Sequence, residues 1–167
     1  MGKFLTPKKD DAGEAICQQQ AAKLLQRFKI SAPPVDVEQI AHDCGLAVDY
    51  VTKGKGFNGR LLKERMVIEV EKSIHLHRQR FTIAHEVGHF VLKHNTVSCY
   101  FDTHNASDPR RLNEYHANVF ASELLMPGPW VQKFWQELRD YRVLAERFIV
   151  SPEAMFRRLE SAGLLGL

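Results

Sequence analysis

The sequence predicts an α+β fold in which a small three-stranded sheet, mixed or antiparallel, packs on helices. Residues 46–70 contain short runs in which apolar and polar side chains alternate, as in half-buried strands. Before and after this stretch, apolar residues recur at the spacing of amphipathic helices. The sheet is therefore expected in the first half of the chain, with helices before and after it in sequence.

The composition is that of an ordinary globular protein with room for one domain. The chain has 167 residues, of which 44% are hydrophobic and 26% are charged. Its net charge of +3 is too small to indicate nucleic-acid binding by itself. Three cysteines without a C-x-x-C pair argue against a disulfide framework or a thiolate zinc site. With no signal peptide and no apolar run of membrane length, we expect a cytoplasmic protein.

The first elements in the chain are two predicted helices. Residues 1–12 are expected to be a polar tail, and residues 13–28 have the pattern of an amphipathic helix. A second helix is predicted to begin after Asp36 as N-cap, with Gln39 as its capping-box partner. Gly45 stands where a helix typically ends, in the position that favours a left-handed backbone.

Three strand signals follow the second helix. Residues 46–51, 58–62 and 66–70 are the predicted strands, the last two joined by a charged turn. The chain then leads into another helix through an extended segment. His75 and His77 alternate in that segment and are expected to share a face at its solvated end.

Residues 80–94, R-F-T-I-A-H-E-V-G-H-F-V-L-K-H, are predicted to form a helix with a metal site. His85 and His89 stand in H-E-x-x-H spacing, so on a helix their imidazoles lie on one face, one turn apart. Two imidazoles placed in this way can bind one metal ion, and Glu86 lies beside that ion. This spacing is typical of zinc hydrolases of the zincin type, in which Glu86 would act as the general base.

Apolar residues cover most of the circumference of this helix, so we expect it to be buried. Burying His85, Glu86 and His89 without partners would be unfavourable, and a metal ion would satisfy their polar atoms. Gly88 costs about 1 kcal/mol of helix stability relative to alanine, which suggests that another backbone or a substrate passes close by. The alternative is a core helix with incidental histidines.

A catalytic zinc site needs a third protein ligand. The extended pattern H-E-x-x-H-x-x-G-x-x-H fails, because Leu92 and Asn95 stand at its glycine and third histidine positions. His94 is five residues from His89, and we expect it on another face of the same helix. The third ligand is therefore sought in the next predicted helix, which begins at Pro109 and runs to about Met126.

That helix carries Glu114 on a face otherwise composed of small and apolar residues. A glutamate in such a position needs a partner, and the metal is the partner that we favour. His116 and Glu123 are the alternative ligands, although His116 is expected to point away from that face and Glu123 into solvent. Asn118, one turn after Glu114, is a candidate for orienting Glu114 or a zinc-bound histidine.

The remaining residues are predicted to form short helices. Residues 127–129, Pro-Gly-Pro, stop the preceding helix, and residues 130–138 make the next one. Residues 143–165 have the pattern of two short helices. Ser151 and Pro152 mark the start of the second as N-cap and first helical residue.

These elements divide the chain into three parts. They are a tail (1–12), a zincin-like core (13–128) and a helix-turn-helix-like segment (129–167). Direct DNA binding by the last part is an alternative function, with Arg157 and Arg158 facing phosphates. Glutamates on the same helix weaken that interpretation.

The two central motifs resemble those of the ImmA/IrrE family of metallopeptidases. R-F-T-I-A-H-E-V-G-H followed by E-x-x-A-N-x-F-A-x-x-L-L-M-P is similar to the family pattern, and the resemblance extends over roughly residues 33–165. It implies that His85, His89 and Glu114 bind Zn²⁺ and that Glu86 is catalytic.

The resemblance also implies a substrate, a helix-turn-helix repressor that is cut at one site to derepress stress-response or mobile-element genes. Peptide hydrolysis needs an oxyanion donor as well. Tyr100, His104, Tyr115 and His116 are the candidates, and the sequence does not choose between them. Relatives that have a sensor domain carry it beyond the matched region, and we expect none in a chain that ends at Leu167.

Two other classes of function compete with a peptidase. One is a DNA-binding regulatory protein with a metal site. The other is an antitoxin-like protein that holds zinc and only sequesters its partner, but a purely structural site would not need Glu86. The expected partner is therefore a protein substrate, with nucleic acid as the alternative and no membrane.

Overall fold

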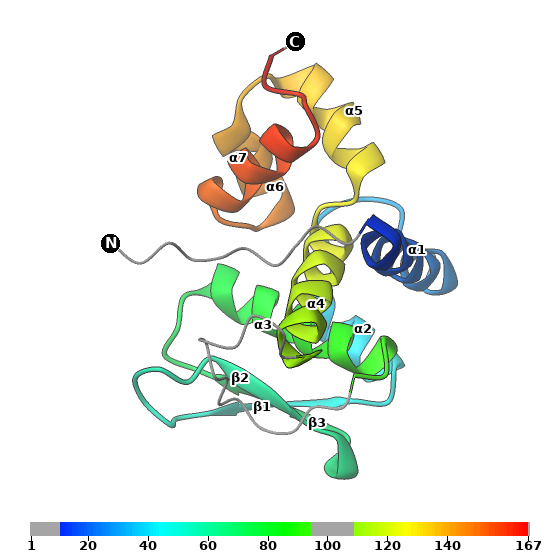
Figure 1. Ribbon diagram of the computed structural model, residues 1–167. Coiled ribbons are helices and arrows are strands. Elements are labelled where there is room, and N and C mark those ends of the chain that lie inside the picture. The colour runs from blue at the N-terminus through cyan, green and yellow to red at the C-terminus, as the bar shows by residue number, and fades with distance from the viewer. Residues whose placement is uncertain (1–10, 95–108, 167) are drawn as a thin grey trace.

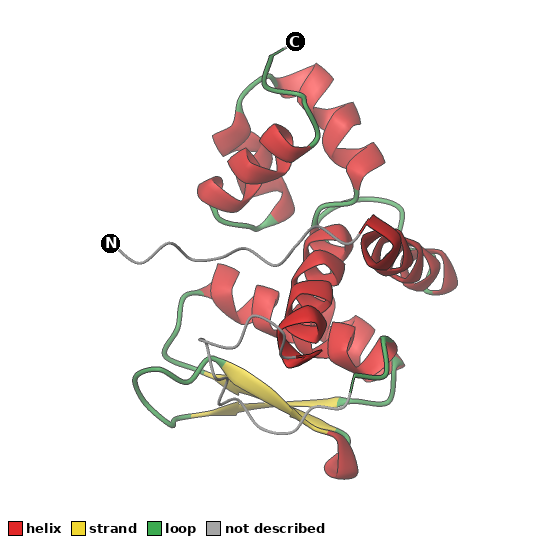
Figure 2. Ribbon diagram, viewed as in Figure 1, coloured by secondary structure: helices red, strands yellow, loops and turns green. Residues whose placement is uncertain are grey.

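The computed structural model describes residues 11–94 and 109–166, and these form an α+β fold (Figures 1 and 2). In chain order the elements are α1 (Asp11–Arg27), α2 (Val37–Asp43), β1 (Ala47–Val51), β2 (Gly59–Leu62), the short 3-10 helix η1 (Lys63–Arg65), β3 (Val67–Glu71), α3 (Leu76–Val91), α4 (Pro109–Leu125), α5 (Gly128–Leu138), α6 (Tyr141–Phe148) and α7 (Pro152–Ser161). The sheet lies at one end of the molecule, α5–α7 lie at the other, and α4 runs between them (Figure 1).

The sheet has three strands in the order β1-β3-β2 and is mixed. The central strand β3 pairs in parallel with β1 and antiparallel with β2, with Ile68 opposite both Val48 and Leu61. Ile68 and Val70 are fully buried, because α2, α3 and α4 lie on one side of the sheet (Figure 2). The predicted sheet is confirmed, and of the two predicted types it is the mixed one.

The first two helices have the predicted positions, with one difference in the capping of α2. The Asp36 side chain accepts a hydrogen bond from the Gln39 backbone N–H at 3.0 Å, as expected of an N-cap. The Gln39 side chain, however, donates to Asp43 at 2.7 Å, so the capping-box role predicted for it is wrong. Gly45 has φ +82° directly after the helix, which confirms the predicted C-terminal turn.

Helix α3 begins earlier and ends earlier than the sequence predicts. His75 is its N-cap, and the His75 ring accepts a hydrogen bond from the His77 backbone N–H. The predicted extended segment carrying both histidines is therefore wrong, since His77 already belongs to the first turn. At the other end, α3 stops at Val91, and Lys93 adopts a left-handed φ of +56°.

Helices α3 and α4 approach each other closely at Gly88. A Cβ atom on Gly88 would lie 2.9 Å from the Phe120 ring and 3.4 Å from the Ala117 Cα of α4. Phe120 is fully buried and has little room to move. The close backbone approach expected at this glycine is confirmed, and it brings the side chains of α4 within reach of those of α3.

The three C-terminal helices have their own buried residues, and α6 and α7 also have side-chain N-caps. Ser151 accepts a hydrogen bond from the Ala154 N–H, so it caps α7 as predicted. The short turn between α6 and α7 consists of residues 149–151. The Trp135 indole donates to the Leu164 carbonyl at 3.1 Å, which ties α5 to the residues after α7.

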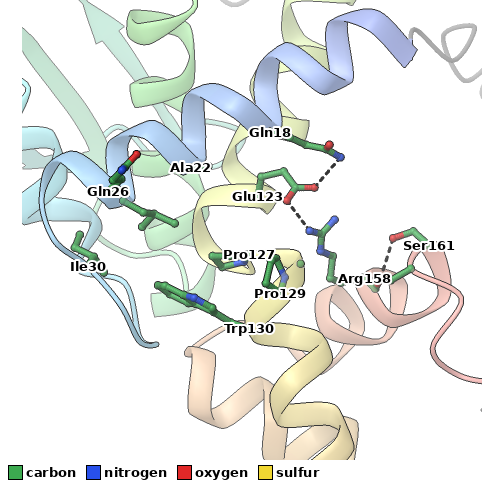
Figure 3. Close-up of a pocket in the computed structure, with 13 residues that line it drawn as sticks. Gln18, Ala22, Gln26, Ile30, Glu123, Pro127, Pro129, Trp130, Arg158 and Ser161 are labelled. Carbon is green, nitrogen blue, oxygen red and sulfur yellow. Dashed lines mark hydrogen bonds and ion pairs between the residues drawn. The ribbon is translucent and has the colours of Figure 1, made fainter.

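A partly buried ion pair connects these helices to the rest of the molecule (Figure 3). Arg158 of α7 donates to the Glu123 carboxylate of α4 at 2.6 Å and to the Met126 carbonyl at 3.1 Å. The Gln18 side chain of α1 donates to the other Glu123 oxygen at 3.2 Å. The pair borders a cavity of about 640 Å³ between α1, the α4–α5 junction and α7. Glu123, expected in solvent, therefore has a structural position instead.

Candidate metal centre

Three side chains from α3 and α4 converge on one point. The Nε2 atoms of His85 and His89 lie 3.0 Å apart. One carboxylate oxygen of Glu114 lies 3.2 Å from the His85 Nε2, and the other lies 3.1 Å from the His89 Nε2. In the described part of the chain this is the one group of three potential metal ligands, and it contains neither His116 nor Glu123.

The donor set and its spacing fit a zinc ion. Imidazole nitrogens and a carboxylate oxygen are ordinary zinc ligands, at about 2.0–2.2 Å from the metal. Ligands at that distance in a tetrahedron are separated by about 3.3–3.6 Å. The two Nε2 atoms are 3.0 Å apart, and each lies 3.1–3.2 Å from one oxygen of the Glu114 carboxylate, which is close to the lower end of this range. His85, His89 and Glu114 could therefore hold one metal ion between them.

The ligand side chains shift one another's pKa values. Burial raises the pKa of the Glu114 carboxyl, but hydrogen bonds from His85 and His89 outweigh burial and bring that pKa down to about 2. Burial also lowers the pKa of the His85 imidazole, but its hydrogen bond to the Glu114 carboxylate and the charge of Glu86 give a net increase. Glu114 is therefore a carboxylate at neutral pH, the form that binds a metal.

Glu86 lies beside the ligand group in a buried position. Glu86 is one of the buried polar residues and has a relative exposure of 8%. Burial raises the pKa of Glu86, although nearby His85 and His89, and a hydrogen bond that the carboxylate accepts from the Leu61 backbone, oppose the increase. Strand β2 can come this close to α3 because Gly59 has no side chain. A Cβ atom at Gly59 would clash with the Thr82 side chain of α3. A carboxyl group with a raised pKa is suited to accept and return a proton near neutral pH.

Each histidine of the group has a second contact behind it. The His85 Nδ1 lies 3.0 Å from the Asn118 side-chain oxygen. The sequence predicted that Asn118 contacts either Glu114 or one of the histidines, and the structure shows the contact with a histidine. The His89 Nδ1 lies 3.1 Å from the His94 Nδ1. His94 was expected on another face of a continuing helix, and this expectation is wrong because α3 ends before it.

Other predicted site residues lie outside the converging group. The Tyr115 hydroxyl donates to Glu14 of α1, so it is engaged between α4 and α1. The His116 ring lies 6.2 Å from the His94 ring, and its role as oxyanion donor stays a prediction. Tyr100 and His104 lie outside the described residues.

The two arginines considered for DNA binding have partners within the fold. Arg158, which is partly buried, is the partner of Glu123 and of the Met126 carbonyl. Arg157 pairs with Glu153 at 2.6 Å on the exposed side of α7. The interaction of Arg158 spans 35 positions in sequence, so no local pattern could have revealed it.

The described residues contain no helix that is long and apolar enough to cross a membrane.

Comparison with known proteins identifies relatives of the chain. Residues 47–160 match the family described as the IrrE N-terminal-like domain. The chain is 35% identical over 101 residues to the radiation response metalloprotease IrrE of Deinococcus radiodurans, covering 56% of this chain and 30% of that protein.

Two further proteins are similar over more of the chain. The radiation response metalloprotease IrrE of Deinococcus deserti is 26% identical over 144 residues, which is 82% of this chain and 51% of that protein. A solved structure, a Mycobacterium tuberculosis transcriptional regulator, has the same fold with a TM-score of 0.66 at 18% identity, over 87% of this chain and 46% of that one. The chain thus spans about half or less of the length of each relative. Since the family match covers both helices of the converging group, the chain belongs to the family of IrrE N-terminal-like domains.

Proposed function

We propose that this protein is a zinc-dependent endopeptidase in which His85, His89 and Glu114 bind the metal and Glu86 is the general base. One observation carries the proposal. The two imidazole Nε2 atoms lie 3.0 Å apart, each has one oxygen of the Glu114 carboxylate within 3.2 Å, and a buried glutamate follows the first ligand directly. The two curated relatives are both described as metalloproteases, which supports the same activity.

The side chains have distinct tasks in this reaction. Zinc, when bound, lowers the pKa of a coordinated water and polarises the carbonyl to be cleaved. Glu86 accepts a proton from the attacking water and returns it to the leaving amine. Its burial supports this task, because burial raises its pKa toward the working range of a general base. Asn118 holds the His85 ring through Nδ1, so that Nε2 faces the metal.

The proposed substrate is a helix-turn-helix transcriptional repressor, cut at one site in the cytoplasm. Cleavage would derepress the genes of a stress response or of a mobile element. Support comes from the motif resemblance and from the description of the curated relatives as radiation response proteins. Residues 13–128 would form the peptidase core, and the helix-turn-helix-like residues 129–167 would present the substrate.

A cleavage assay with the regulator encoded beside this protein tests the proposal. The wild-type protein with zinc should produce two fragments of the regulator. Glu86→Gln should retain zinc and lose at least about 100-fold in cleavage rate, because the amide cannot accept the proton. Glu64→Gln, a change at an exposed glutamate on η1, serves as the matched control and should cleave like the wild type. Unchanged cleavage by Glu86→Gln would contradict the mechanism.

A further inference from the structure

We infer that His94 is a positioning residue, which holds the His89 ring in the tautomer whose Nε2 lone pair faces the metal. The inference rests on the metal site of the proposed function. His94 is no part of the H-E-x-x-H motif, and it does not belong to the group of three ligand side chains. Its ring lies behind His89, with 3.1 Å between the two Nδ1 atoms.

The end of α3 brings His94 to this position. After Val91 the backbone leaves the helix, and the left-handed φ of +56° at Lys93 turns it back. The His94 backbone N–H then donates to the His89 carbonyl at 3.0 Å, which closes the turn. The Lys63 side chain donates to the His94 carbonyl. Both backbone polar groups of His94 are thus bonded, and the residue is buried with a relative exposure of 8%.

The contact between the two rings defines the tautomers. Two imidazole nitrogens at hydrogen-bond distance need one N–H and one lone pair between them. A metal bound at the His89 Nε2 requires the lone pair there, so the proton of neutral His89 resides on Nδ1. The His94 Nδ1 is then the acceptor, and neutral His94 carries its own proton on Nε2.

Without this acceptor, the other tautomer of His89 would gain an advantage. A proton on Nε2 of His89 could bond to the Glu114 carboxylate, which lies 3.1 Å away, and it would occupy the metal-binding lone pair. The buried Nδ1–H would also have to find another acceptor, because burying it unpaired is unfavourable. His94 opposes both effects in the same way as Asn118 does for His85, whose Nδ1 lies 3.0 Å from the Asn118 oxygen.

Zinc affinity, measured by competition with a chromophoric chelator, tests this inference without any peptide substrate. His94→Leu removes the acceptor and should raise the zinc dissociation constant about 10- to 100-fold. His94→Asn places an amide oxygen near the original Nδ1 position and should restore most of the affinity. Asn118→Leu removes the acceptor of His85 and is the matched comparison. His42→Ala removes an exposed imidazole and should bind zinc like the wild type.

Nitrogen NMR of the histidine rings in the zinc-loaded wild-type protein gives a second readout that needs no variant. The expected spectrum shows His89 bound through Nε2 and protonated at Nδ1, and His94 protonated at Nε2 only. A spectrum with His94 protonated at Nδ1 would overturn the inference, even if His94→Leu failed to fold.

The outcomes separate this inference from the proposed function. If wild-type protein and His94→Leu bind zinc with equal affinity, or if His94→Asn binds as weakly as His94→Leu, then His94 does not position His89, and the metal site itself stands. If the wild-type protein takes up no zinc, the proposed function fails, and the inference fails with it.

Discussion

His85 and His89 reach the same point because they are one helical turn apart, and each ring contacts a different residue behind it. Glu114 completes the group from α4 and is held as a carboxylate by the two imidazoles. Glu86 points to the same region but is buried against β2 and its pKa is raised. At the scale of single residues, the two glutamates therefore have opposite environments, one suited to metal binding and one to proton transfer.

Zinc should stabilise the folded protein through these residues. A free zinc concentration 100 times the dissociation constant adds about 2.7 kcal/mol to the free energy of unfolding. For a chain of this size, this corresponds to an increase of roughly 5–10 °C in the unfolding temperature. Thermal unfolding with zinc, and after its removal by a chelator, measures the effect. Glu114→Ala should lose most of it, whereas His42→Ala should keep it, and an equal gain in both variants would argue against Glu114 as a ligand.

At the scale of elements, the separation between α3 and α4 determines whether Glu114 reaches the histidines. The two helices touch where Gly88 of α3 meets Phe120 and Ala117 of α4. Strand β3 also contacts α3, and its side chains Ile68 and Val70 are fully buried. The site therefore depends on small side chains at positions that take no part in the chemistry.

Gly88→Ala should push α4 away from α3. Alanine favours a helix by about 1 kcal/mol over glycine, but overpacking a core typically costs about 1–3 kcal/mol. We expect a net loss of up to about 2 kcal/mol in chemical denaturation, together with weaker zinc binding. In a Phe120→Leu background, which makes room, the same change should cost less. Equal effects in both backgrounds would show that the contact with Phe120 is unimportant.

Glu71, at the end of β3, holds the loop after β1 in place. One carboxylate oxygen accepts from the backbone N–H groups of Lys53 and Gly54, and the other accepts from Ser73. The backbone hydrogen bond from Lys53 and the side-chain bond from Ser73 are the largest causes that bring the pKa of Glu71 down to about 2. The usual pKa of a glutamate in an unfolded chain is about 4.3.

This shift predicts a dependence of stability on pH. Because the pKa is lower in the folded state, the ionised Glu71 stabilises the protein fully above its unfolded pKa, and this stabilisation disappears as the pH falls toward 2. Glu71→Gln should therefore unfold more easily than the wild type at pH 7, with the difference closing below about pH 4. Unfolding midpoints across this range measure it. Glu64→Gln is the exposed control, and a constant difference at all pH values would contradict the prediction.

At the scale of the whole molecule, the C-terminal helices are attached to the core by polar contacts from three elements. Arg158 and Glu123 connect α7 to α4, and Gln18 extends the contact to α1. Arg80 of α3, a few residues before the ligands, donates to the Ile149 carbonyl between α6 and α7 at 3.1 Å. Helix α3, which carries His85 and His89, is therefore in direct contact with the C-terminal helices.

The partly buried ion pair of Arg158 and an exposed ion pair on the same helix allow a matched comparison. Arg158→Met removes a charged hydrogen bond between groups that are 15% and 11% exposed, and should lower the free energy of unfolding by about 1.5–3 kcal/mol. Arg157→Met breaks the pair with Glu153, in which both groups are 74% exposed. This variant should change the free energy of unfolding by at most about 0.5 kcal/mol. Chemical denaturation of both variants measures the difference. Equal losses would show that burial of the Arg158 pair is unimportant.

The sequence by itself determined those features that depend only on local geometry. The spacing of His85 and His89 places both rings on one face of any helix, and side chains such as Asp36 and Ser151 cap helices through contacts within three residues. Alternating side chains identified the strands. These signals depend on neighbours along the chain, so they can be interpreted without knowing the fold.

Only the tertiary structure decided which distant groups meet. The sequence favoured Glu114 over His116 and Glu123 as the third ligand, and the packing of α4 against α3 is what brings Glu114 to the two histidines. The tertiary structure also returned His94 to His89 through a left-handed residue that is a lysine, a type with no preference for that conformation. Glu123, expected in solvent, became the partner of an arginine 35 positions away. Long-range contacts of this kind depend on how whole elements pack. The helix face and the motif could favour Glu114, but no local pattern indicated the contacts of His94 and Glu123.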